Sequence, residues 1–222
     1  MSNDFILDQK NDTSVINKVY GLLATTMLPT LFAIFLGYQF FQSNPQAPIA
    51  VIIISFLISI GLLFGIRKAT GNVALFLLYA FTFFEGLILS GAVWSVSTNY
   101  TNGNSILINT AVMTTAVFAG MATIGSIVKR DLSGMSSFLF TGLILLIVGQ
   151  IVNFFFQSGL FVLVLSSAGA LLFSLYIMYD VNQIVKNKTT NVIWATVSLY
   201  LDIVALFVNL LNILTILSGN KK

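Results

Sequence analysis

The sequence has no cysteine, no histidine, only three prolines and only 8% charged residues. Without cysteine and histidine, disulfides, thiolate nucleophiles, imidazole general bases and the usual zinc and haem sites are excluded. The scarcity of charge excludes an ordinary soluble domain, which carries about 25% charged residues. Few side chains are therefore left to carry chemistry.

What the sequence does have is long apolar runs, with 57% hydrophobic residues and a mean hydropathy of +0.97 over 222 residues. A helix needs about 20 apolar residues to cross roughly 30 Å of hydrocarbon. The sequence predicts an all-α membrane protein, with residues 1–18 as a cytoplasmic segment, 19–217 as a seven-helix membrane domain and 218–222 as a short tail. The predicted spans are Val19–Phe41, Ile49–Ile66, Val73–Val96, Ser105–Val128, Phe138–Phe156, Phe161–Val185 and Val192–Leu217.

Basic residues alternate between the connectors. Arg67–Lys68, Lys129–Arg130 and Lys186 with Lys188 fill three of them, and the other three contain no Lys or Arg. Because basic residues stay in the cytoplasm, the N-terminus is predicted inside and the C-terminus outside. The first 18 residues carry three aspartates and do not resemble a signal peptide.

Lys221 and Lys222 then fall on the outer side. A six-span model, with Val192–Leu217 re-entrant, would return them to the cytoplasm. We prefer seven spans.

Two aspartates, Asp180 and Asp202, lie inside the last two apolar runs. An ionisable residue within hydrocarbon indicates a functional site. Each belongs to a polar face at helical spacing. These faces are Ser166, Gly169, Phe173, Tyr176, Asp180 and Gln183 in the sixth span, and Ser198, Asp202, Ala205, Asn209 and Asn212 in the seventh.

The hairpin between these spans predicts that the two carboxyl groups meet. At 1.5 Å per residue, Asp180 and Asp202 lie about 9 and 15 Å from the cytoplasmic ends of their helices. Two carboxylates in a low-dielectric site cannot both ionise cheaply, so we expect one shared proton and a pH sensor that needs no histidine. Two independently satisfied structural carboxyls are the alternative.

Glu85 is a third acid within a span, at a depth similar to Asp202. Either it joins the same polar core or ion path, with Ser198, Asn209 and Asn212, or it is protonated and bonds a neighbouring backbone. Arg67 is interpreted as a topology anchor. Alternatively, it snorkels inward and latches the aspartates.

The segments YIMYDVNQI (176–184) and SLYLDIVALFVNLLNIL (198–214) closely resemble the last two spans of the Bax inhibitor-1 family, particularly its bacterial members. The resemblance implies a last helix that is central and wrapped by two three-helix layers, in a bacterial inner membrane. It also implies a pH-dependent calcium leak governed by an aspartate pair, which falls on Asp180 and Asp202. Some relatives instead restrain a membrane-anchored ATP-dependent protease. The sequence departs from the family at Gly65, near the expected place of a latching arginine, and at Ser90–Gly91, where a Gly-Pro is frequent.

The first functional reading is a channel-like leak in which Asp180 and Asp202 bind calcium weakly and transiently through hard oxygen ligands. The alternative is a non-conducting regulatory protein that binds another membrane protein, such as that protease. An intramembrane aspartyl protease would need Gly-x-Gly before Asp202, where Leu199, Tyr200 and Leu201 stand. A proton-coupled transporter would show broken helices in paired halves. We therefore expect no enzyme, no cofactor beyond calcium as permeant ion, no nucleic-acid partner, and a monomer in the lipid bilayer.

Overall fold

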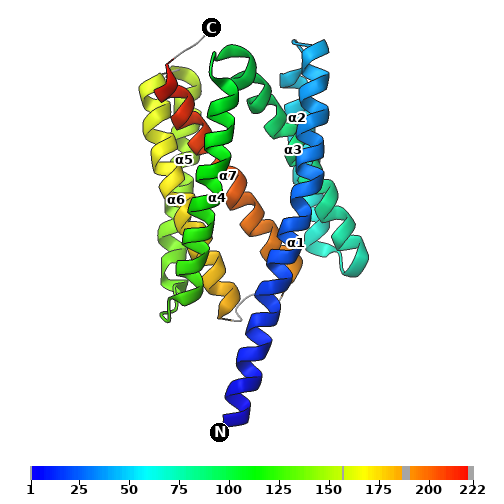
Figure 1. The fold of residues 1–222 in the computed structure, drawn as a ribbon, viewed down its shortest axis with the longest axis vertical. Coiled ribbons are helices and arrows are strands. Elements are labelled where there is room, and N and C mark those ends of the chain that lie inside the picture. The colour runs from blue at the N-terminus through cyan, green and yellow to red at the C-terminus, as the bar shows by residue number, and fades with distance from the viewer. Residues whose placement is uncertain (1, 157, 187–190, 220–222) are drawn as a thin grey trace. The chain divides into compact units, whose positions relative to one another are not determined.

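The computed structural model describes residues 2–156, 158–186 and 191–219, and in these residues it is all-helical (Figure 1). All seven long helices have the length and apolar composition to cross a membrane, which confirms the predicted fold class. The elements are α1 (Ser2–Ser43), α2 (Pro48–Lys68), α3 (Gly71–Asn99), α4 (Gly103–Ile127), the 3-10 turn η1 (Ser133–Met135), α5 (Ser136–Phe156), α6 (Gly159–Val185) and α7 (Val192–Ser218).

Local sequence signals delimit several of these helices. Pro48 is the first residue of α2, where its missing N–H is not needed and its fixed φ suits a helix. The last turn of α2 carries Arg67 and Lys68, whose positive charges favour the negative end of the helix dipole. Ser158 precedes α6, and its Oγ accepts a hydrogen bond from the backbone N–H of Phe161 at 3.4 Å.

The polar N-terminal segment is helical, because α1 begins at Ser2 and continues without a break into its apolar part, Val15–Ser43. The predicted cytoplasmic location of this segment stays a prediction. Four residues used to predict the topology and the connectors, Gln157, Lys188, Lys221 and Lys222, lie outside the described residues.

The helices divide into two compact units. The α1–α3 unit contains residues 18–103 and 191–197, and the α4–α7 unit contains residues 2–17, 104–186 and 198–219. Helix α7 thus contributes its first residues to one unit and most of its length to the other.

The α1–α3 unit is held together by close contacts between α1 and α3. The hydroxyl of Thr30 in α1 shares its one hydrogen between the carbonyl of Thr26, at 2.9 Å, and that of Thr82 in α3, at 3.1 Å. A side chain added at Gly86 would collide with the backbone of Thr30, so the small residue lets the two helices approach. Thr30 and Thr82 are both buried.

The α4–α7 unit is built around α6. A side chain at Gly125 of α4 would collide with the backbone of Met178 in α6, and one at Gly142 of α5 would collide with the side chain of Leu172. Helices α5 and α6 run side by side (Figure 1). Helix α6 therefore packs against α4 and α5, and its remaining face meets α7 as described below.

Helices α5 and α7 differ in how much apolar surface they expose. In α5 only Leu139 is buried, and large apolar side chains are exposed along its length. In α7 the large apolar side chains that are exposed are Trp194 and Leu217, near its two ends, whereas Leu199 and Leu206 are buried. This is what the polar face of α7 predicts, since its polar groups need partners other than lipid. The wrapping of α7 by two three-helix layers stays a prediction.

Candidate functional site

The site is built on the antiparallel seam between α6 and α7, whose register is constant. Asp180 contacts Ser198. Four residues earlier on α6 and four residues later on α7, Tyr176 interacts with Asp202. Seven residues further along each helix, Gly169 lies against the side-chain amide of Asn209. An equal number of residues separates successive pairs on the two helices, so residues of the polar face of α6 lie opposite residues of the polar face of α7.

The seam brings the two aspartates together. The carboxyl of Asp180 is in hydrogen-bond contact with the carboxyl of Asp202 and with the hydroxyl of Ser198. Asp202 is only 7% exposed, and its Oδ2 has no hydrogen-bond partner among the described groups. The contact between the two carboxyl groups is the geometry that the hairpin register predicts. Two touching carboxylates repel strongly, so one shared proton would stabilise them. The sharing of that proton stays a prediction.

Tyr176 is a neighbour of the pair that the sequence placed on the polar face of α6 but not among the site residues. Its phenol interacts electrostatically with Asp202 and Asp180. Its ring stacks on Phe173, with centroids 6.0 Å apart and an angle of 29° between the planes. The spacing of one helical turn from Asp180 was the available signal. The negative charge of the pair therefore acts on this phenol.

Asn209 continues the seam beyond the pair. Its Nδ2 donates to the carbonyl of Ala205 at 2.8 Å, and its amide fills the space beside Gly169 that a side chain would occupy. Asn212, one turn further along α7, is partly buried. Of the predicted polar-core residues, Ser198 touches the aspartate pair and Asn209 and Asn212 follow along the same face.

Glu85 and Arg67 belong to the other unit. The carboxyl of Glu85 in α3 faces the hydroxyl of Ser59 in α2, which is buried and does not complete a well-formed hydrogen bond with it. The structure thus associates Glu85 with α2. Arg67 is exposed at the end of α2, and its role as a latch stays a prediction.

Asn182 is an important polar residue that the sequence interpretation missed. It is fully buried, and its Nδ2 lies 3.2, 3.2 and 3.3 Å from the carbonyls of Gly125, Val128 and Arg130. Its Oδ1 accepts from the N–H of Leu132 at 3.1 Å. One side chain therefore binds the end of α4 and the α4–α5 connector to α6, two residues beyond the aspartate of that helix.

A second contact fastens the same connector. Ser133 Oγ lies 2.7 Å from Asp131 Oδ1 and 3.0 Å from Gln183 Oε1, but a hydroxyl has one hydrogen to donate. If the Gln183 amide is turned over, its Nε2, which otherwise has no partner among the described groups, donates to Ser133. Both bonds then form, and the connector is held to α6 at two successive residues.

The aspartate pair offers few ligands to a cation. Calcium usually takes six to eight oxygen ligands. In the described part of the chain, no three acidic, histidine or cysteine side chains gather to hold a metal ion. The pair and Ser198 supply a few oxygens, which suits transient binding and not a resident ion.

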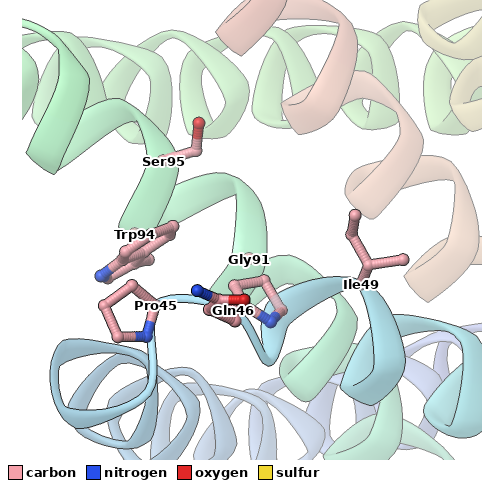
Figure 2. A pocket seen from close by; sticks show the side chains of 7 residues that line it. Pro45, Gln46, Ile49, Gly91, Trp94 and Ser95 are labelled. Carbon is pink, nitrogen blue, oxygen red and sulfur yellow. The ribbon is translucent and has the colours of Figure 1, made fainter.

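A separate pocket of about 590 Å³ opens in the α1–α3 unit (Figure 2). It lies where the α1–α2 connector and the start of α2 meet α3, and Trp94 and Pro45 face each other across it. The residues that line it are Pro45, Gln46, Pro48, Ile49, Gly91, Trp94 and Ser95. None of these carries a charge, so the pocket offers no carboxylate to a cation.

The comparisons with known proteins identify the family of the chain. The family described as "Inhibitor of apoptosis-promoting Bax1" matches residues 12–219. A membrane protein of Vibrio cholerae is 34% identical, with 93% of this chain and 91% of the relative aligned. Protein lifeguard 4 of Mus musculus is 35% identical and the Golgi anti-apoptotic protein of vaccinia virus 32%, each over 93% of this chain and 86% of the relative. The chain is thus a multi-pass membrane protein that belongs to the Bax inhibitor-1 family.

Proposed function

We propose that this protein is a pH-sensitive calcium leak of the bacterial inner membrane, with its N-terminus in the cytoplasm and its C-terminus outside. The proton-sharing pair of Asp180 and Asp202 is the sensor and gate. The observation that supports this most directly is the contact between their two carboxyl groups at the α6–α7 seam, in helices long enough to span the membrane.

The chemistry of the pair links protons to calcium. With one shared proton the pair carries a single negative charge and a hydrogen bond that holds α6 to α7. Loss of that proton leaves two negative charges in a low-dielectric site, which either repel each other or attract a cation. Calcium prefers such hard oxygen ligands, so protonation and calcium binding compete for the same two groups.

The test is calcium flux into proteoliposomes between about pH 6 and 8, where a coupled buried pair can titrate. Asp180→Asn and Asp202→Asn keep the shape of the side chain but remove the shared proton. We expect each to lose most of the pH dependence of the flux. The matched control is Glu85→Gln, which removes a carboxyl of the other unit and should change the rate more than the pH response. The sensor assignment is wrong if both aspartate variants keep the wild-type pH profile.

A regulatory function is the second candidate, because the name of one relative, the Golgi anti-apoptotic protein of vaccinia virus, describes regulation and not transport. In that case the chain binds another membrane protein, such as an ATP-dependent protease, and conducts nothing. Wild-type protein that reconstitutes in folded form and passes no calcium at any pH would favour this function over the leak.

A further inference from the structure

The polar face of the α6–α7 seam extends well beyond the aspartate pair. In the register given above, three residues beyond the Gly169–Asn209 contact bring Ser166 of α6 opposite Asn212 of α7. Thr215 follows Asn212 by three residues on α7. From Asp202 to Thr215 the helix rises about 20 Å, which is two thirds of the hydrocarbon thickness.

Three polar atoms along this seam are buried and unpaired among the described groups. They are Asp202 Oδ2, Ser166 Oγ and Thr215 Oγ1. An unpaired polar atom in hydrocarbon costs about 2 kcal/mol or more. Three of them on the polar faces of the same two helices indicate a region that water reaches.

Ser166 gives the clearest evidence, because its neighbour in sequence behaves in the usual way. A serine within a helix can satisfy its hydroxyl by bonding the carbonyl one turn earlier. Ser167 does this, with its Oγ 2.7 Å from the carbonyl of Leu163. The hydroxyl of Ser166 makes no such bond, although the residue is 0% exposed. It is therefore free to bond a group within the seam.

The polar face has one bulky apolar interruption. Between the aspartate level and the Gly169–Asn209 level, the register brings Phe173 opposite Ala205, and Phe173 is held by stacking on Tyr176. On both sides of this level the facing residues are small or polar. In this register Phe173 lies between the part of the seam that contains the aspartates and the part that contains Ser166, Asn209 and Asn212.

We propose that the α6–α7 seam is a hydrated path that carries water and protons between the aspartate pair and the C-terminal end of α7, and that Phe173 is its constriction. Only the role of the path, which is to supply the shared proton, rests on the proposed function. The hydration of the seam is a property of its own and can be measured without any calcium flux.

The absence of native cysteine makes the test clean, since a single introduced cysteine is then the only thiol. Ser166→Cys is nearly isosteric, and the matched control is Leu165→Cys, the adjacent residue, which is also buried and contacts α5 at Gly149. Both variants are reconstituted in vesicles and exposed on either side to 2-aminoethyl methanethiosulfonate, a small cation that reacts with the thiolate formed in water. Modification is followed by mass spectrometry.

We expect Ser166→Cys to react at least about tenfold faster than Leu165→Cys, since only a hydrated thiol ionises. Equal, slow reaction of both would overturn the hydrated path. If labelling is fast but no variant or wild-type protein passes calcium, the path stands and the leak fails. If labelling is slow while calcium flux responds to pH through the aspartates, the leak stands and this route is wrong.

The constriction is tested in a second pair of variants. Asp202→Cys lies beyond Phe173 for a reagent that enters from the C-terminal end of α7. Adding Phe173→Ala should raise its labelling rate from that side by about tenfold, whereas Phe173→Leu, which keeps a bulky group, should leave it nearly unchanged. If Asp202→Cys is labelled at the same rate alone, with Phe173→Ala and with Phe173→Leu, Phe173 is not the constriction.

Discussion

Two regions of the same helix, α6, bury polar groups in opposite ways. At Asn182 the buried amide is used completely, with its Nδ2 on backbone carbonyls and its Oδ1 on a backbone N–H. At Ser166 the buried hydroxyl is unpaired, and across the seam so is one oxygen of Asp202. A buried polar group whose bonds are all made inside the protein stabilises the fold. One left open next to other polar groups is available to water, protons or ions.

The largest effect should follow from breaking the paired region. Asn182→Ala removes the two N–H donors that the carbonyls of Gly125, Val128 and Arg130 share and the acceptor of the Leu132 N–H, at about 1–3 kcal/mol for each bond lost from a group that stays buried. We expect a loss of several kcal/mol in the free energy of unfolding, measured by thermal or denaturant unfolding in detergent micelles. Asn99→Ala is the control, because Asn99 is exposed and its side chain bonds Ser95, one turn away on the same helix. Equal stability of the two variants would show that the Asn182 bonds contribute little.

A smaller effect on stability is expected from substitutions at two glycines of α4, Gly125 and Gly120, which form a matched pair. A side chain at Gly125 meets the rigid backbone of Met178 in α6, whereas nothing lies within 4 Å of one at Gly120. Gly125→Ala should destabilise by about 1–3 kcal/mol through overpacking. Gly120→Ala should stabilise by up to about 1 kcal/mol, because alanine favours a helix. The two melting temperatures should move in opposite directions, and a shift of the same sign would contradict the α4–α6 contact.

The smallest effect should come from the open region. Ser166→Ala removes a hydroxyl that has no partner among the described groups, so folding loses no protein hydrogen bond. We expect a change in the free energy of unfolding between about zero and 1 kcal/mol in the stabilising direction. Thr110→Ala is the comparison, since its buried Oγ1 bonds the carbonyl of Ile106 at 2.7 Å and its loss should destabilise. A larger loss for Ser166→Ala than for Thr110→Ala would mean that the seam hydroxyl is structural.

The sequence predicts much of the fold because its signals are local. Long apolar runs with few charged residues indicate where helices cross the membrane, and every predicted span corresponds to a helix. The meeting of Asp180 and Asp202 was also predictable, because a short hairpin fixes the register of two neighbouring helices. The position of Tyr176 beside the pair was predictable from the same spacing, but its uncharged side chain did not mark it as a site residue.

The partners of Asn182 could not be predicted in this way. They are backbone groups 50 to 57 residues earlier in the chain, and backbone carbonyls leave no mark in a sequence. The same holds for Glu85. Its depth in the sequence suggested a position near Asp202, whereas in the structure its carboxyl faces the hydroxyl of Ser59 in α2. Which helices pack together depends on the fit of many side chains and not on any one residue.

The fastening of the α4–α5 connector has a consequence for changes in chain length. Loops usually accept insertions, because lengthening a flexible segment costs little entropy. Here Asn182 bonds backbone groups at Gly125, Val128, Arg130 and Leu132, so their spacing along the chain is fixed by one rigid amide. A single residue inserted between Val128 and Leu132 would move part of this set out of reach. The connector is therefore a poor place for a tag or a fused domain, although its Lys129 and Arg130 side chains are exposed.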